Sequence, residues 1–191
     1  MRKSTLLAVV AAFVLGGMVG AFAFLGKQAL GPAGFAAQPL KPVWTEVQWP
    51  FLVDQWGKGK AFRCAAEDCG TEVNLYLRAK IGFCNCTTGV SDDEELERLS
   101  DFDLMGTHIA NLGDGRPITV SWMKGRSRSY TFTGAVRGGK SALSVAFNDR
   151  CDAIVATVVT GHDRPSVLEP AVLEFLNGKT VLRWAEVTLG L

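Results

Sequence analysis

The sequence predicts an α+β domain, with an antiparallel (meander) sheet and two main helices packed on it, preceded by one N-terminal transmembrane helix. Three observations support this prediction. A long uncharged segment opens the chain, apolar and polar residues alternate from residue 73 to 83, and short strand-like segments with tight turns follow residue 115. Short strands joined by tight turns pair as an antiparallel sheet, and such a sheet needs a helix over at least one face.

The uncharged opening segment runs from Leu6 to Gly26, and its 21 residues are enough to span a hydrocarbon core of about 30 Å. Basic residues precede it, which predicts that this end stays in the cytoplasm and the rest is exported. We expect residues 1–27 to be a membrane anchor or signal segment, residues 28–42 a Pro/Gly-rich tether, and residues 43–191 an exported domain. The protein would then be a single-pass protein of the cytoplasmic (inner) membrane.

A cleaved signal peptide is the alternative, because residues 21–23 and 34–36 have the small-residue pattern of cleavage sites. The uncharged segment is longer than the ~7–15 residues of a usual signal-peptide core, which favours the anchor. Cleavage would leave the protein secreted or periplasmic. Under either alternative the folded part lies outside the cytoplasm.

Three tryptophans, Trp44, Trp49 and Trp56, lie at the start of the exported region. Indoles at this density can form an aromatic binding face, so the three are candidate interface residues. More often such residues belong to the core, with each indole N–H finding a partner, and this interpretation is favoured.

A hairpin is predicted next. Residues 61–64 form its first strand, residues 65–68 its loop, and the alternating segment its second strand. Val73, Leu75, Leu77 and the other odd positions share one face, whereas Arg78, Lys80 and the other even positions share the opposite face. A period of two predicts one buried face and one face in water.

Two helices and five further strands complete the prediction. Ser91 and Glu94 form a capping box at the start of the first helix, and Pro170 suits the first turn of the second, which ends near Asn177. Strands are expected over residues 118–123, 129–133, 142–147 and 153–159, with turns at 124–126, 137–140 and 148–150. Residues 180–189 are predicted to form a last strand, with a helix as the alternative.

The five cysteines are interpreted first as disulfides. Cys64 and Cys69 flank a short hairpin loop, where the usual Cα separation suits a bridge. Cys151 can pair with either Cys84 or Cys86, which leaves one thiol over or in an intermolecular bond. The alternative is a zinc or copper site made by Cys64, Cys69, Cys84 and Cys86, or thiol–disulfide exchange at the C-x-C pair.

Residues Gly134 to Ser141 match the phosphate-binding pattern G-x-x-x-x-G-K-[ST]. That pattern cradles phosphate only between a strand and a helix, whereas the residues after Ser141 alternate like a strand. A Gly-Gly hairpin turn is the favoured interpretation, and nucleotide is not an expected partner. His108 and His162 are the only histidines, and neither suggests a nucleophile–base pair, so an enzyme is the less favoured reading.

Charge is uneven along the chain, with acids concentrated over residues 92–103 and bases over residues 116–140. The basic segment could meet anionic lipid or face the acidic helix within the fold. A net charge of +1 argues against a nucleic-acid partner. The sequence therefore predicts a non-catalytic, membrane-tethered binding or assembly domain with an envelope protein partner. A metal- or thiol-handling protein that uses the cysteine cluster is the alternative.

Overall fold

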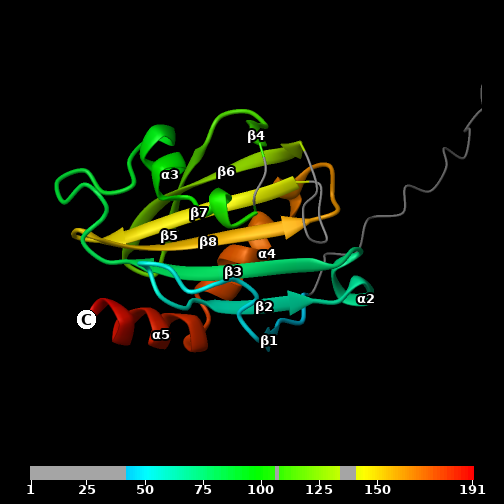
Figure 1. Cartoon of the computed structure of the whole chain (residues 1–191), viewed down its shortest axis with the longest axis horizontal. Coiled ribbons are helices and arrows are strands. Elements are labelled where there is room, and N and C mark those ends of the chain that lie inside the picture. The colour runs from blue at the N-terminus through cyan, green and yellow to red at the C-terminus, as the bar shows by residue number, and fades with distance from the viewer. Residues whose placement is uncertain (1–41, 106–107, 134–140) are drawn as a thin grey trace, which may run out of the picture. The chain divides into compact units, whose positions relative to one another are not determined.

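The computed structural model describes residues 42–105, 108–133 and 141–191, which belong to one structural unit (Figure 1). The elements in chain order are β1 (Thr45–Val47), β2 (Lys60–Cys64), α2 (Ala66–Cys69), β3 (Val73–Lys80), α3 (Asp93–Leu99), the 3₁₀ turn η1 (Phe102–Met105), β4 (His108–Asn111), β5 (Arg116–Val120), β6 (Met123–Thr133), β7 (Ser141–Asp149), β8 (Asp152–Thr160), the 3₁₀ turn η2 (Pro165–Leu168), α4 (Glu169–Leu176) and α5 (Lys179–Leu189).

Eight strands of the described residues form one antiparallel sheet in the order β1-β2-β3-β8-β7-β6-β4, and β5 pairs with β6 beside β4. The α+β class and the antiparallel sheet are confirmed. The sheet is not a simple meander, because β8 returns to the centre and pairs along the whole length of β3. This return brings residues 73–80 and 153–160, which are far apart in the sequence, side by side in the middle of the sheet.

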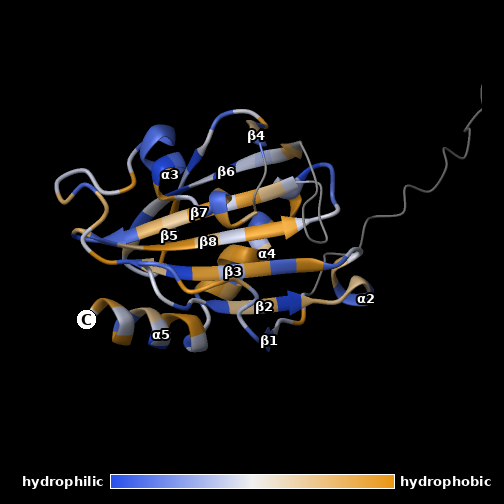
Figure 2. Cartoon of the chain, in the orientation of Figure 1, coloured by the Kyte–Doolittle hydropathy of each residue, from blue (hydrophilic) through white to orange (hydrophobic). Residues whose placement is uncertain are grey.

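One face of the sheet, which we call the apolar face, is covered by the C-terminal helices. Its strand residues come from β3, β7 and β8 and are fully buried: Val73, Leu75, Leu77, Leu143, Val145, Phe147, Ile154, Ala156 and Val158. The helices contribute Val172, Leu176, Val181, Ala185 and Leu189. Figure 2 shows the central strands largely in hydrophobic colours. Burial of this area at about 25 cal/mol per Å² is the main stabilising contribution.

The opposite face, which we call the polar face, carries α3 and the segments around residues 49–56 and 100–105. Figure 1 shows α3 and α4 on opposite sides of the sheet. Two separate apolar groups lie on this face, one around Tyr76 and Phe102 and one around Leu96 and Val155.

The strands predicted at residues 61–64, 142–147 and 153–159 are confirmed, as is the helix that begins near Pro170. The turn predicted at 124–126 is wrong, because these residues continue β6, and the chain instead turns at Ser121, whose φ is 54°. A Cβ on Gly125 would lie 2.0 Å from the carbonyl oxygen of Ala146. This glycine therefore permits the close pairing of β6 with β7.

Residues 180–189 form a helix, so the predicted last strand is wrong. Val181, Ala185 and Leu189 are buried at a spacing of four residues, the period of a helix that covers a sheet. The loop predicted at 65–68 is largely the short helix α2, which ends at Gly70 with a φ of 72°. The cap of α3 is Asp92, one residue after the predicted Ser91.

Candidate functional site

Three of the four even positions of β3 are buried on the polar face and Asn74 is half-buried, so the prediction that this face meets water is wrong. Tyr76 is 8% exposed, Arg78 1% and Lys80 5%. Apolar and polar residues do alternate along β3, but other segments of the chain cover both faces of the strand. The covering residues come from two distant segments, residues 49–56 before β2 and residues 100–105 after α3.

Four charged side chains meet there, and we call them the ion cluster: Asp54, Arg78, Lys80 and Asp101. The Nη2 atom of Arg78 lies 2.5 Å from Oδ2 of Asp54. Oδ1 of Asp101 lies 3.0 Å from Nζ of Lys80 and 3.6 Å from Nε of Arg78. The two cations and two carboxylates balance formally. Because an unpaired buried charge costs several kcal/mol, about 3–5 in typical cases, each member depends on the others.

Aromatic rings lie over both cations. The guanidinium carbon of Arg78 is 5.9 Å from the ring centroid of Trp49. Nζ of Lys80 is 5.5 Å from the ring centroid of Trp56 and 5.8 Å from that of Phe83. Cation–π attraction strengthens when the cation is desolvated, as both are here. The rings therefore stabilise the charged form of the two residues inside the fold.

The end of α3 places Asp101 over β3. The hydroxyl of Ser100 donates to the carbonyl of Leu96, and its oxygen lies 2.6 Å from Oγ of Ser144 on β7. This contact fixes the residue before Asp101 against the sheet. Burial raises the pKa of Asp101, and the positive charges of Lys80 and Arg78 offset this only in part. The ionised form of Asp101, the more buried of the two carboxylates, is therefore less favoured inside the fold than in water.

Ion pairs with basic residues of β6 hold α3 in place. Asp93 pairs with Arg126, and Nη1 of Arg128 lies 2.7 Å from Oε1 of Glu97. Burial opposes ionisation of Asp93, but the N–H of Gly115 and the two arginines outweigh it and hold its pKa below the usual value. The interpretation that basic strands face the acidic helix within the fold is therefore supported at these pairs.

A pocket of about 450 Å³ opens beside the ion cluster. Its lining residues are Pro50, Phe51, Leu52, Asp54, Tyr76, Asp103, Leu104 and Met105. Asp54 belongs both to the pocket wall and to the ion cluster, so the two features are continuous. Asp103 is exposed, and its carboxylate makes no ion pair with another described residue. A volume within the range of about 300–1,000 Å³ is typical of small-molecule sites.

The pocket combines two carboxylates with aromatic and apolar walls. The rings of Phe51 and Tyr76 are in edge contact, with centroids 4.9 Å apart. Neither histidine is among its lining residues: Nε2 of His162 lies 3.1 Å from the carbonyl oxygen of Cys69, and His108 belongs to β4. Carboxylates beside aromatic rings suit the recognition of an organic cation.

The three tryptophans are all half-buried rather than exposed. Trp44 packs against Phe175 on the apolar face, whereas Trp49 and Trp56 cover the ion cluster. The expected partner for each indole N–H is not found at Trp49, whose Nε1 is buried without a hydrogen-bond partner among the described residues. A role of these residues at an interface stays a prediction.

The cysteines form two disulfides. The predicted Cys64–Cys69 bridge is confirmed, and Cys151 pairs with Cys86. Cys84 is the free thiol and is buried. The four cysteines of the metal alternative are thus divided between two bridges and a thiol, and no group of three or more His, Cys, Asp or Glu side chains in the described residues is arranged to hold a metal ion.

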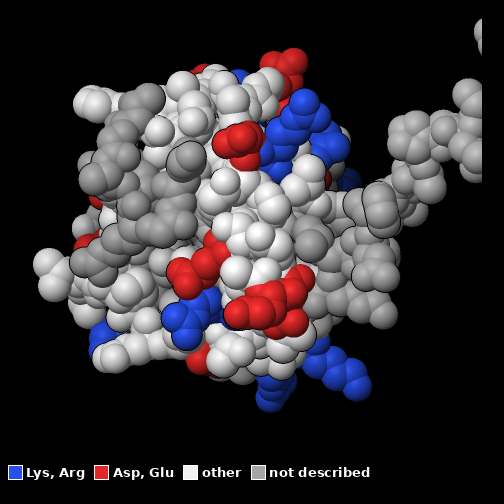
Figure 3. Space-filling model, turned by 90° about the vertical axis from the view of Figure 1, so that its right-hand side faces the viewer, with Lys and Arg blue, Asp and Glu red and all other residues white. Residues whose placement is uncertain are grey.

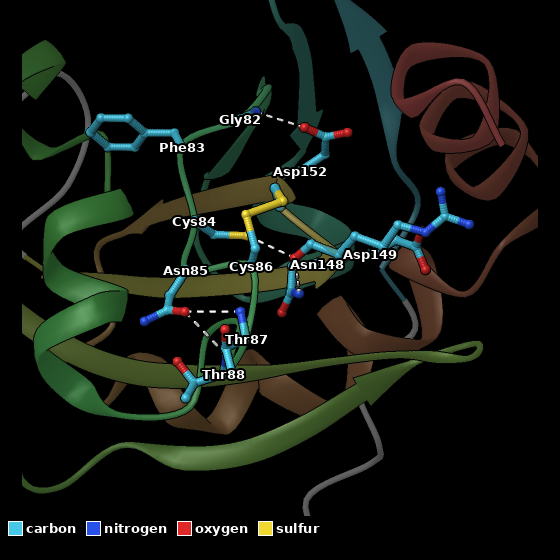
Figure 4. Close-up of a disulfide and its surroundings, with 12 residues drawn as sticks. Gly82, Phe83, Cys84, Asn85, Cys86, Thr87, Thr88, Asn148, Asp149 and Asp152 are labelled. Carbon is cyan, nitrogen blue, oxygen red and sulfur yellow. Dashed lines mark hydrogen bonds and ion pairs between the residues drawn. A yellow bond between two sulfur atoms is a disulfide. The ribbon is translucent and has the colours of Figure 1, made fainter.

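Figure 4 shows the surroundings of the Cys86 bridge, with Cys84 on the same loop. The backbone N–H of Cys84 donates to the carbonyl of Cys151 at 3.2 Å, and its thiol donates to the carbonyl of Arg150 at 3.2 Å. Burial raises the pKa of the Cys84 thiol, and the charges of Glu95 and Asp152 add to this effect. The thiol is therefore protonated at neutral pH.

The phosphate-binding pattern lies mostly outside the described residues, but Ser141 begins β7 rather than a helix. The anchor and the tether up to residue 41 also lie outside the described residues, and no described helix is long and apolar enough to cross a membrane. On the face shown in Figure 3, acidic and basic side chains of the described residues form small groups among neutral ones, and several acidic groups lie next to basic ones.

Sequence reasoning missed the ion cluster and the pocket. Asp54, Asp101 and Asp103 lie in segments that have no regular period, so no pattern pointed to them. The available signal was the pair of basic residues within an otherwise apolar strand, since a cation on a central strand needs a carboxylate from elsewhere.

No protein-family model matches the chain, and a search of curated proteins found none similar to it.

Proposed function

We propose that the chain is a membrane-tethered, extracytoplasmic binding domain that takes a basic side chain of an envelope protein partner into the pocket between Asp54 and Asp103. It acts without catalysis of its own. The uncharged segment at residues 6–26 supports the tether, and the two disulfides support an oxidising compartment.

The observation that carries this proposal is the carboxylate of Asp103 at the pocket, exposed and without an ion pair among the described residues. Asp54 is already held by Arg78 and accepts from the backbone N–H of Trp56 at 2.8 Å. Among the described residues, the pocket therefore has one carboxylate that is neutralised and one that makes no ion pair. A single positive charge complements this arrangement.

The apolar wall suits the stem of a lysine or arginine. Leu104 and Met105 line the pocket, and long basic side chains bury their methylene groups while the charged end meets a polar group. Leu52 at the pocket is 91% exposed and Val53 60%, which leaves apolar side chains for a partner surface to cover.

The binding test uses n-butylammonium, which copies the end of a lysine side chain, with n-butanoate and n-butanol as probes of opposite and no charge. The full chain in detergent micelles is titrated by NMR. We expect the ammonium to bind with a Kd on the order of 1 mM, which corresponds to about 4 kcal/mol, and the butanoate not to bind.

Asp103→Asn should weaken ammonium binding several-fold, whereas Asp68→Asn, which removes an exposed carboxylate on α2, should not. Equal binding of butanol and ammonium, with no effect of Asp103→Asn, would show an apolar pocket and contradict the proposal. The membrane tether is tested separately by fractionation and N-terminal sequencing. A soluble mature chain that begins near residue 23 or 37 would replace the anchor with a cleaved signal peptide.

A further inference from the structure

Three cysteines meet where the loop after β3 crosses the turn between β7 and β8. Cys86 is exposed and bonded to Cys151, whereas Cys84 is buried and free. Figure 4 shows Cys84 and Cys86 on one short stretch of chain beside this turn. A free thiol beside a disulfide is the arrangement that thiol–disulfide exchange requires.

We propose that Cys151 exchanges its partner between Cys86 and Cys84, and that this isomerisation presents Cys86 as a reactive thiol on the surface. This activity is independent of the pocket and goes beyond the binding function proposed above.

Hydrogen bonds hold Cys84 beside Cys151. The N–H of Cys84 donates to the carbonyl of Cys151 at 3.2 Å, and its thiol donates to the carbonyl of Arg150, the residue before Cys151, at 3.2 Å. The Cα atoms of Cys86 and Cys151 are 4.2 Å apart. Cys84 and Cys86 are thus both held against the turn that carries Cys151.

The loop is also held in place without the disulfide. Its far end is fixed by Asn148, whose Oδ1 accepts from the N–H of Val90 at 3.0 Å and whose Nδ2 donates to the carbonyl of Arg150 at 2.9 Å. Asn85 accepts from the N–H groups of Thr87 and Thr88, which closes the turn between the two ends. Exchange of the bridge therefore leaves the loop attached to the β7–β8 turn.

The step balances without an oxidant. The Cys84 thiol loses its proton, and the thiolate attacks Sγ of Cys151. The Cys84–Cys151 bond forms, the Cys86–Cys151 bond breaks, and the Cys86 thiolate leaves and takes a proton from water. The exposed Cys86 thiolate can then attack a disulfide of a partner molecule, which forms a mixed disulfide and releases the partner's second sulfur as a thiolate.

Burial controls the rate of the first step. Cys84 lies among Val90, Leu96 and Leu99 in an apolar group, and this surrounding disfavours its thiolate. Only the thiolate attacks, so exchange is slow at neutral pH. Below the pKa of Cys84, the rate should rise about tenfold per pH unit, because the thiolate fraction does so.

The test is alkylation of the native full chain with iodoacetamide at about pH 7, 8 and 9, followed by tryptic mapping without reduction. Cys84 and Cys86 lie together in peptide 81–98, and Cys151 lies in peptide 151–179. Fragmentation between the two cysteines locates the label. We expect the label on Cys86, with Cys84 linked to Cys151. A label on Cys84, or no label over a period in which the denatured chain reacts fully, would overturn the proposal.

Two variants make the test independent of labelling rate. Cys86→Ser should still form a bridge, Cys84–Cys151, and should contain no free thiol. Cys84→Ser should keep the Cys86–Cys151 bridge and take up no label at any pH. The buried Cys64–Cys69 bridge is the internal control and should stay closed in every variant. Two free thiols in folded Cys86→Ser would exclude the alternative bridge.

Discussion

Leu77 and Arg78 are neighbours on β3 and are almost equally buried, at 0% and 1% exposure, yet they belong to two different kinds of interior. Leu77 lies on the apolar face under the C-terminal helices, within one cluster of buried hydrophobic residues. Arg78 lies on the polar face, where Asp54 and Asp101 balance its charge and that of Lys80. The comparison shows that burial alone does not describe a residue's contribution to stability.

The two faces differ in what a substitution removes. On the apolar face a truncation loses transfer free energy and leaves a cavity, and the neighbours relax into part of it. On the polar face a truncation leaves an opposite charge buried without its partner, which relaxation does not repair. The pocket opens on the polar face. The face that tolerates truncation less well is therefore also the one that we propose to bind a partner.

The largest effect is expected for Asp101→Ala. This change leaves Lys80 without its carboxylate and Arg78 with Asp54 alone, so the free energy of unfolding should fall by about 3–5 kcal/mol. Urea unfolding measures the loss. The matched control is Glu46→Ala, which breaks the more exposed pair with Lys60 and should cost about 1 kcal/mol or less.

A double variant distinguishes the cost of leaving a charge unpaired from the cost of losing packing. Lys80→Met combined with Asp101→Leu removes both charges of one pair and keeps the Arg78–Asp54 pair. It should be clearly more stable than Asp101→Ala, because buried ion pairs can often be replaced by apolar residues at little cost. If Asp101→Ala stays within about 1 kcal/mol of the wild type, the cluster does not act as a coupled unit.

A somewhat smaller effect is expected on the apolar face. Leu77→Ala should lower the free energy of unfolding by about 2–5 kcal/mol, and Leu77→Met by less than about 1.5 kcal/mol, because it conserves volume. Both are measured by urea unfolding at pH values from about 4 to 8, over which the loss should stay constant. A loss that varies with pH would mean that the two faces are not energetically separate.

The smallest effect is a difference in pH dependence between Asp101 and Asp93. Burial raises the pKa of Asp101, so the stability of the wild type relative to Asp101→Asn should be greatest below the unfolded pKa of about 3.9. This advantage decreases as pH rises through the folded pKa, because the folded state binds the proton more tightly than the unfolded chain.

Asp93 should respond with the opposite sign. Its pKa is lowered in the folded state, so the advantage of the wild type over Asp93→Asn is full above about pH 3.9 and is lost as pH falls through the folded pKa. Unfolding midpoints of the three proteins from about pH 3 to 7 measure both trends. Curves with the same sign for the two variants would contradict this assignment of the charges.

Features that depend on near neighbours in the chain could be predicted from the amino-acid sequence. The alternation over residues 73–80, the strands at 142–147 and 153–159 and the Cys64–Cys69 bridge all follow from local period, turn residues or spacing. Each of these signals acts over fewer than about ten residues, so distant segments do not change it.

Which faces of the strands are covered depends on contacts between segments that are distant in the sequence. The period of β3 separates Leu77 from Arg78, but whether the second face meets water depends on Asp54 and Asp101, which come from other segments. The same reason explains residues 180–189, whose composition fits a strand, whereas packing of Val181 and Ala185 on the sheet selects a helix. Long-range pairing of charge and packing of a whole face are properties of the assembled sheet, and no local pattern encodes them.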